Sequence, residues 1–370
     1  MGAATKSCSE PKDQLGGMMR RPLILMTQLA VLVGSGLPQR RPVQEFDFTH
    51  VSTLPHGTER VQFVTSSHAY GITGDRPIAS NDGGRTWFKM RIGGPDFRIA
   101  RLFASGPLRA DALGYSAGQQ LIYRTADGGI TWDDWTNDLR LPKGFRALDL
   151  RVGSNGEEVW VGGSFPLQRQ VSDLDVGESI PAVLYRPNGR DVLRVFRLSE
   201  GGSHPIDALV GPATTTRLAL SRDSAYVYQS DQGRWSLANF GPEERGLVDA
   251  RPLGAFFLDS STGWLSYSSG ALFVTADGGV HWRKVMDGGT LWPDPRKPAG
   301  FIRISFRSSK LGLAVGWGVM FSTVDGGHTW SRLKTPDNIW DFGLYSNDKG
   351  WAFSEGSLYQ LTVSHPNRTR

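Results

Sequence analysis

One short motif recurs along the chain and constrains its fold more than any other feature. Each copy runs from a Ser or Thr, or its equivalent, through Asp-Gly-Gly to a Trp. The four complete copies are Ser80–Trp87, Thr125–Trp132, Thr275–Trp282 and Thr323–Trp330, and a shorter, degraded copy spans Ser230–Trp235. Paired glycines allow the positive φ angles that a tight hairpin turn requires. The motif therefore predicts a β-hairpin tip that is repeated along the chain.

The polar side chains of the motif have a role within their own turn. The Asp carboxylate can accept hydrogen bonds from turn N–H groups, and the Ser or Thr hydroxyl can add another. The Trp enters the outgoing strand and buries its ring beside the turn. We therefore expect the repeated Asp and Trp residues to be structural and not catalytic. They are Asp82 and Trp87, Asp127 and Trp132, Asp277 and Trp282, and Asp325 and Trp330.

The spacing of the motif predicts a β-propeller. Asp82 and Asp127 are 45 residues apart, Asp231 and Asp277 are 46 apart, and Asp277 and Asp325 are 48 apart. A period of about 40–50 residues with several short strands per repeat is typical of a propeller blade. The gap of 104 residues between Asp127 and Asp231 predicts two blades, and Asn188-Gly189 is the remnant of the missing turn.

The last blade needs a strand from elsewhere, because the copy after Asp325 would fall near position 371. Val43–His50 alternates like a strand and precedes the first blade. Since an open sheet edge invites pairing with other chains, we expect this segment to complete the last blade. The prediction is an all-β fold: one seven-bladed propeller of four-stranded blades over residues 37–365, with residues 366–370 as a tail.

Residues 1–36 have the pattern of a secretory signal peptide. Arg20 and Arg21 precede an apolar run from Leu23 to Val33, and Gly34-Ser35-Gly36 follows it. A positive segment, a short apolar core and a small-residue exit define such a leader, and the run is short for a membrane span. A start at Met18 or Met19 would give a more ordinary leader length. The alternative is a disordered tail with a chance apolar run.

Charge and cysteine content limit the classes of partner. The chain has 41 basic and 36 acidic residues, of which four and two lie in the leader, so the remainder carries a net charge of +3. A surface with such balanced charge does not indicate binding to nucleic acid. Cys8, the only cysteine, lies in the leader, so the mature chain would suit an oxidising compartment. We expect an exported monomer, periplasmic or secreted.

Several segments around the motif resemble a known family. They are Gly263-Trp264-Leu265 before the Asp277 turn, Leu311–Gly316 before the Asp325 turn, and Gly350–Phe353 in the last blade. These resemble the Asp-box (bacterial neuraminidase repeat, BNR) propellers, most closely the photosystem II stability and assembly factor-like family. The resemblance covers residues 44–363. It implies an exported, non-enzymatic scaffold that binds a protein partner, such as a membrane protein, in the cell envelope.

The resemblance also raises a carbohydrate-active alternative, because Asp boxes occur in sialidases and other glycoside hydrolases. Phe97-Arg98-Ile99-Ala100 is similar to the sialidase Phe-Arg-Ile-Pro signature, but it follows the first motif and Ala100 replaces the proline. A sialidase would also need three arginines, a Tyr–Glu pair and an Asp, and no spacing singles these out. The seven histidines have no metal-ligand spacing. We expect no metal and no cofactor. If the chain were an enzyme, a glycoside hydrolase would be the class, and a carbohydrate-binding propeller is a further alternative.

One candidate site remains, on the innermost strands. We aligned these strands on Phe63, Phe103, Val152, Val210, Phe257, Phe306 and Leu344. Three residues earlier the column reads Arg60, Ala100, Asp149, Asp207, Gly254, Arg303 and Asp341. Because inner strands line a propeller's channel, the column predicts a ring of three carboxylates and two guanidinium groups. The ring is either a plug of ion pairs that joins the blades or a site for a small polar or charged ligand.

Overall fold

The computed structural model describes residues 45–74, 76–153, 156–167, 179–189, 191–198, 202–212, 215–240, 250–287, 291, 300–346 and 348–364. The chain divides into two units, Met1–Val43 and Gln44–Arg370, and the described residues belong to the second. The predicted leader and the tail 366–370 lie outside the described residues. Within the described part, no helix is long and apolar enough to cross a membrane.

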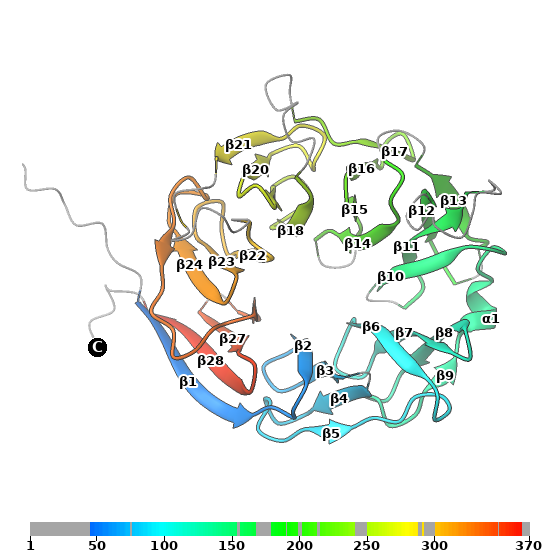
Figure 1. Ribbon diagram of the computed structural model, residues 1–370, viewed down its shortest axis with the longest axis horizontal. Coiled ribbons are helices and arrows are strands. Elements are labelled where there is room, and N and C mark those ends of the chain that lie inside the picture. The colour runs from blue at the N-terminus through cyan, green and yellow to red at the C-terminus, as the bar shows by residue number, and fades with distance from the viewer. Residues whose placement is uncertain are drawn as a thin grey trace, which may run out of the picture. The chain divides into compact units, whose positions relative to one another are not determined.

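The second unit is a seven-bladed propeller of four-stranded antiparallel sheets (Figure 1). Blade one consists of β2 (Thr58–Phe63), β3 (Ala69–Thr73), β4 (Arg76–Ser80) and β5 (Phe88–Lys89). Blade two consists of β6 (Arg98–Ala104), β7 (Ala110–Ser116), β8 (Gln119–Thr125) and β9 (Asp133–Asp134). Blade three consists of β10 (Arg146–Val152), β11 (Val159–Pro166), β12 (Ser179–Arg186) and β13 (Arg194–Arg197).

The remaining blades repeat this plan. Blade four consists of β14 (Ile206–Val210), β15 (Leu218–Ser221), β16 (Ala225–Gln229) and β17 (Arg234–Leu237). Blade five consists of β18 (Pro252–Phe257), β19 (Gly263–Tyr267), β20 (Leu272–Thr275) and β21 (Arg283–Met286). Blade six consists of β22 (Arg303–Phe306), β23 (Gly312–Gly316), β24 (Val319–Thr323) and β25 (Ser331–Arg332). Blade seven contains β26 (Asp341–Leu344), β27 (Lys349–Phe353) and β28 (Ser357–Ser364).

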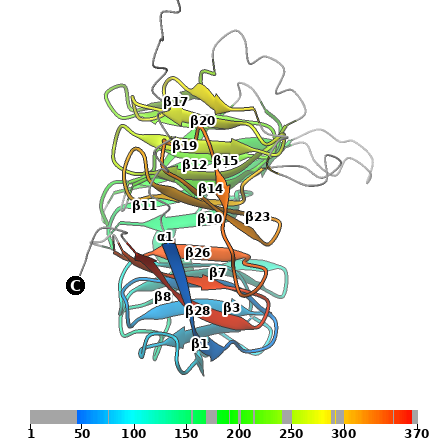
Figure 2. The same ribbon diagram turned by 90° about the vertical axis from the view of Figure 1, so that its left-hand side faces the viewer.

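The fourth strand of blade seven is β1 (Glu45–Thr53), which pairs antiparallel with β28 from Glu45–Ser364 to Thr53–Ser357. Figure 2 shows the blue β1 beside the red β28. The strand continues three residues past His50, where the sequence analysis ended it, and Val43 and Gln44 lie outside the described residues. The two strands are therefore paired although they come from opposite ends of the chain.

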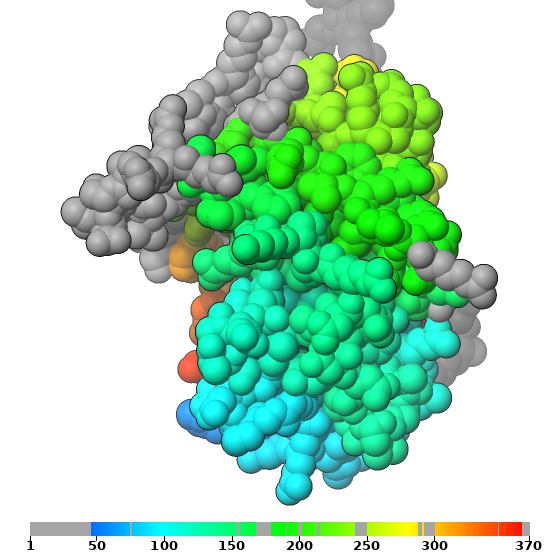
Figure 3. Space-filling model, turned by 90° about the vertical axis from the view of Figure 1, so that its right-hand side faces the viewer, coloured from blue at the N-terminus to red at the C-terminus, as the bar shows by residue number. Residues whose placement is uncertain are grey.

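The hydrophobic core lies between neighbouring blades. The second strand of each blade is shielded by the blades on either side of it, and every residue of β19 and of β23 is buried. The sequences of such strands are continuous runs of small and apolar residues, as in Gly263-Trp264-Leu265. Figure 3 shows blades two, three and four as adjoining bands from cyan to green. The one helix among the described residues is the single turn α1 (Thr136–Leu139), after β9.

The repeated motif connects the third and fourth strands of its blade, as a hairpin tip. In blade five the Thr275 hydroxyl donates to Asp277 Oδ1 at 2.9 Å and accepts a hydrogen bond from Gly279 N at 2.9 Å. His281 N donates to the same carboxylate at 2.9 Å. Trp282 is buried, and its Nε1 donates to Gly279 O at 2.7 Å. The Asp is thus held within its own turn, as the sequence analysis predicted.

The second glycine of each complete motif also touches the preceding blade. A methyl group at Gly129 would lie 2.1 Å from Met90 Sδ of blade one, and one at Gly327 would lie 2.8 Å from Leu272 Cδ2 of blade five. Gly279 approaches Val227 of blade four in the same way. Because only glycine leaves this space, each tip is fitted against its neighbour, and the motif joins blades as well as strands.

Blade three has lost the motif, and Arg186 stands in its place. Arg186 pairs with Val159 at the start of β11, just as Thr275 pairs with Gly263 at the start of β19. The Arg186 side chain is buried, lies 5.1 Å from the Trp135 ring centroid, and donates to Asp138 O at 3.2 Å. The turn after it keeps a hydrogen bond from Asp191 N to Asn188 Oδ1 at 3.0 Å. The predicted Asn188-Gly189 remnant therefore lies in the β12–β13 connection.

Candidate binding site in the axial cavity

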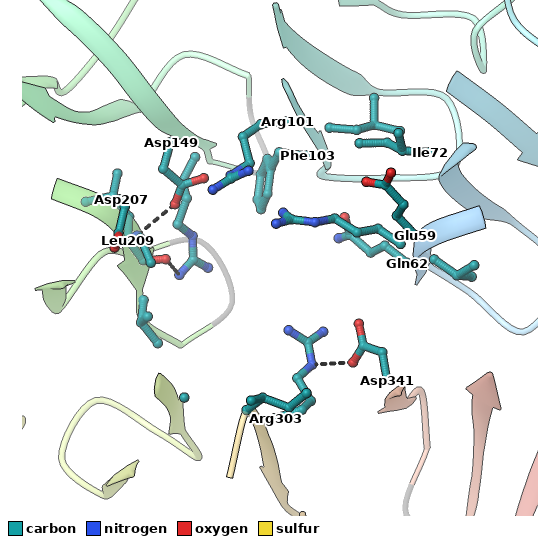
Figure 4. Close-up of a pocket in the computed structure, with 18 of the residues that line it drawn as sticks. Glu59, Gln62, Ile72, Arg101, Phe103, Asp149, Asp207, Leu209, Arg303 and Asp341 are labelled. Atoms are coloured by element: carbon teal, nitrogen blue, oxygen red, sulfur yellow. Dashed lines mark hydrogen bonds and ion pairs between the residues drawn. The ribbon is translucent and has the colours of Figure 1, made fainter. Parts of the chain in front are cut away.

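A cavity of about 600 Å³ lies at the propeller axis and is lined mainly by the innermost strands of the seven blades. All five charged residues of the predicted ring line this cavity (Figure 4). They are Arg60, Asp149, Asp207, Arg303 and Asp341. Three further charged residues, Glu59, Arg101 and Arg151, line it as well. The site is therefore larger and more cationic than the sequence column indicated.

A repeated irregularity in the inner strands explains which residues reach the cavity. In each of blades one to five, the pairing of the first strand with the second skips one residue. Such a β-bulge re-aims the side chains that follow it. In the first three blades the residue directly after the skipped position is Arg60, Arg101 and Asp149. The bulge thus places a charged side chain at the same height in three successive blades.

The sequence column was out of register at blades two and four. At blade four it contains Asp207, the skipped residue of the bulge, which lines the cavity nonetheless. At blade two it contains Ala100 in place of Arg101. Ala100 is the skipped residue of the bulge, and it is Arg101 that pairs with Leu113 and lines the cavity. The error at blade two came from aligning Phe103 with Phe63. The register instead matches Phe63 with Ala104, since each pairs with a buried alanine that opens the next strand, Ala69 or Ala110. Counting back three residues from Ala104, as from Phe63 to Arg60, would have found Arg101.

One ion pair joins blades six and seven across the cavity wall. Arg303 Nε lies 3.0 Å from Asp341 Oδ1, and Phe342 N donates to the same oxygen at 2.8 Å. Burial raises the pKa of Asp341, and the nearby Arg303 guanidinium opposes this shift. This pair matches the plug of ion pairs that the sequence analysis considered.

Asp149 is held by backbone on the other side of the ring. It accepts a hydrogen bond from Leu209 N at 2.7 Å, which joins blade three to blade four. Arg151 Nη1 donates to Gly211 O of the same neighbouring blade at 3.3 Å. Burial raises the pKa of Asp149, while the Leu209 hydrogen bond and the charges of Arg101 and Arg151 oppose the shift. These two side chains therefore serve the contact between blades as well as the cavity wall.

Two guanidinium groups of the cavity make no ion pair within 4 Å among the described residues. They belong to Arg60 and Arg101, and the one hydrogen bond between Arg101 and a described residue runs from Nη1 to Ala100 O at 3.1 Å. Burial and the positive charge of Arg101 lower the pKa of Arg60, while the negative charges of Asp149, Asp341 and Glu59 oppose this shift. Figure 4 shows the Arg101 side chain extending toward the centre of the cavity beside Asp149. Two like charges that face one shielded space favour an anionic ligand between them.

Burial affects all three carboxyl groups of the ring in the same direction. It raises the pKa of Asp149, Asp207 and Asp341. A glycoside hydrolase needs one protonated and one ionised carboxyl group, and the directions of these shifts do not single out such a pair. Within the described part of the chain, no group of three or more His, Cys, Asp or Glu side chains could hold a metal ion.

Comparison with known proteins supports the fold. No family model matches the sequence, and no curated protein matches it either. Among solved structures, YCF48 bound to a D1 peptide is 17% identical with a TM-score of 0.57, covering 90% of this chain and 98% of that one. YCF48 from Cyanidioschyzon merolae is 18% identical with a TM-score of 0.58, covering 87% and 99%. The WD40 propeller of Doa1 is 13% identical with a TM-score of 0.55, covering 87% and 98%. At these identities the likeness establishes the propeller fold alone.

Proposed function

We propose that this protein is an exported, non-enzymatic propeller scaffold that binds a segment of a protein partner in the cell envelope, such as a membrane protein during its assembly. The observation that carries the proposal is the pair of guanidinium groups, Arg60 and Arg101, that faces the axial cavity with no carboxylate oxygen within 4 Å among the described residues. A plug that served stability alone would pair these charges, because a shielded charge without a partner is costly. An acidic group of a partner would complete the ring.

Two further observations support a scaffold. The repeated Asp residues are held by their own turns. The YCF48 structure to which this chain is similar holds a D1 peptide. We also assign the four complete motifs to the Asp-box (BNR) class, from their sequence and hydrogen bonding. The scaffold acts as a monomer in this proposal, without metal or cofactor.

A capture experiment with matched arginine variants tests the proposed site. The full chain, an Arg60→Met/Arg101→Met variant and an Arg332→Met control are used to capture proteins from the native envelope. Arg332 is an exposed arginine on the outermost strand of blade six. We expect a membrane or envelope protein that the wild type and the control retain and that the double variant loses at an unchanged Tm. An identical captured set for all three proteins would contradict the proposal.

A second measurement addresses the enzyme alternative. The full chain is incubated with sialosides and other glycosides, and sugar release is followed. We expect no release above the level of an Asp149→Asn variant. Asp149 lines the cavity. Hydrolysis by the wild type that is lost in the Asp149→Asn variant would therefore assign the protein as a glycoside hydrolase and contradict the scaffold proposal.

Export is tested separately through the leader. Residues 1–36 are fused to an alkaline phosphatase that is active only after it leaves the cytoplasm. We expect activity from this fusion and its loss when Arg20 and Arg21 are changed to Glu, since the positive segment directs insertion of a signal peptide. Equal activity with and without residues 1–36 would contradict the proposed export.

A further inference from the structure

Three large apolar side chains are exposed at the same end of blades six and seven. Ile302 is 41% exposed, Trp317 is 50% exposed and Trp340 is 41% exposed. Ile302 directly precedes Arg303, Trp340 directly precedes Asp341, and both line the cavity. Trp317 lies in the turn between β23 and β24. We call these three residues the apolar rim.

Backbone hydrogen bonds connect the segments that carry the rim residues. Ile302 N donates to Val315 O at 2.9 Å, at the end of the strand that leads into the Trp317 turn. Ile339 N donates to Gly318 O at 2.9 Å, so the residue after Trp317 is bonded to the residue before Trp340. In an antiparallel blade the start of the first strand and the turn between the second and third strands lie at the same end. The rim therefore spans blades six and seven at the end opposite the repeated tips.

The conformation of Trp317 is unusual for a bulky residue. Trp317 has a φ of 52° and Gly318 a φ of 78°, so both central residues of this two-residue turn are left-handed. Such turns favour Asn-Gly or Gly-Gly, and a bulky residue at positive φ is strained. The equivalent turn of blade two, Ala117-Gly118, has the same conformation, with φ of 48° and 75°. Blade six therefore differs in placing a large aromatic side chain at this position.

The neighbourhood of the rim indicates the chemistry of its ligand. An exposed apolar cluster beside charged groups has the composition of a protein-binding hot spot, where Trp and Arg are enriched. The adjoining cavity offers the Arg60 and Arg101 guanidinium groups, whose charge calls for an anion. A neutral polysaccharide could stack on the Trp rings, but it would form no ion pair with either guanidinium group. A peptide that carries an apolar side chain and an acidic group satisfies both surfaces.

We propose that the apolar rim of Ile302, Trp317 and Trp340 binds an aromatic or branched aliphatic side chain of a partner peptide whose acidic group lies at Arg60 and Arg101. This inference rests on the proposed function, because it places a second contact of the same peptide at the mouth of the same cavity. It also gives the partner a recognisable sequence: an apolar residue close to an acidic one.

Selection of random peptides displayed on phage against the full chain tests the inference. We expect the selected peptides to be enriched in an aromatic or branched aliphatic residue near an Asp or Glu. Synthetic copies of them are then measured by calorimetry against the wild type, Trp317→Asn, Trp340→Ser and the Arg60→Met/Arg101→Met variant. Ile130→Ser is the control, since Ile130 is 79% exposed in the blade-two tip at the opposite end.

The Trp317→Asn variant separates binding from folding. Asn accepts the left-handed conformation, so its Tm should rise by about 1–4 °C while affinity falls roughly tenfold or more. Trp340→Ser should weaken binding by a similar factor, and Ile130→Ser should leave it unchanged. If peptides require the two arginines but bind Trp317→Asn and Trp340→Ser with wild-type affinity, the inference about the rim is wrong and the proposed function stands. If peptides bind the Arg60→Met/Arg101→Met variant with wild-type affinity, the proposed function is wrong. Glycans that bind only through Trp340 would show that the rim binds carbohydrate.

Discussion

Replacing Gly84 by Ala tests how the ring is held closed. Gly84 is the second glycine of the blade-one tip and has a φ of +84°. A methyl group there would lie 2.2 Å from Cδ2 of Leu358, which is 1% exposed on β28 of blade seven. Ser52 Oγ of β1 donates to the Gly84 carbonyl oxygen. This tip therefore touches both strands of the pair that completes blade seven.

The expected loss has two parts. A left-handed conformation costs an alanine about 1–2 kcal/mol relative to glycine. Carbon atoms normally approach to about 3.5–4.0 Å, so Leu358 must move by more than an ångström, and such overpacking costs about 1–3 kcal/mol. Gly84→Ala should therefore lower the free energy of unfolding by about 2–5 kcal/mol. Equilibrium urea unfolding followed by Trp fluorescence measures this quantity.

A matched control isolates the contact between blades. Gly118 has a φ of +75° in the β7–β8 turn, and a methyl group there would meet no atom within 4 Å. Gly118→Ala should therefore show the conformational cost alone, about 1–2 kcal/mol. Leu358→Ala makes room for the methyl group, so Gly84→Ala combined with it should cost less than the sum of the two single changes. Equal losses for Gly84→Ala and Gly118→Ala would refute the reasoning.

Three other outcomes follow from the repeated tips. Trp282→Ala should lower the free energy of unfolding by about 3–5 kcal/mol, as for other buried aromatic residues, and a loss below that of an exposed substitution would contradict the burial of this ring. Asp277→Ala should cost about 1–3 kcal/mol, because turn donors lose their acceptor; urea unfolding measures both. Burial alone would raise the pKa of Asp82, but hydrogen bonds from Thr86 and Ser80 lower it to about 2, and hydrogen bonds from Thr131 lower the pKa of Asp127 to about 2. The unfolded carboxyls, with pKa values near 3.8, take up protons first as pH falls, so this stabilisation is present above pH 4 and is lost toward pH 2. The urea midpoint should fall less steeply over that range in an Asp82→Asn/Asp127→Asn variant, and parallel curves would contradict the assignment.

The blades could be predicted from the sequence because the information that marks them is local. Each tip closes its hydrogen bonds within a few residues, from Thr275 to Gly279 and from Asp277 to His281, so its residue types recur at fixed offsets. Glycines at the tip cannot be replaced without a clash, as at Gly327. A constraint of this kind stays visible in a single sequence, and the spacing of the copies then predicts the number of blades.

The details of the cavity depend on interactions between blades, so they were harder to predict from the sequence. Arg101 was missed because the inner strands of blades one and two were aligned on Phe63 and Phe103, whereas the strand pairing matches Phe63 with Ala104. Arg303 has a carboxylate partner, whereas Arg101 has no ion pair among the described residues. This difference depends on distances across the ring. The exposure of Trp317 was equally hidden, since its left-handed turn contradicts the local preference of the residue.

The pairing of β1 with β28 has a consequence for how the chain reaches its native state. Ser364 Oγ donates to Asp47 across 317 residues of sequence, so this contact forms only after nearly the whole propeller has been synthesised. Contacts of such long range slow folding, and until they form β28 presents an unpaired edge. The first strand to be made is thus among the last to be placed, and the interval before it pairs is when the polypeptide is most prone to aggregate.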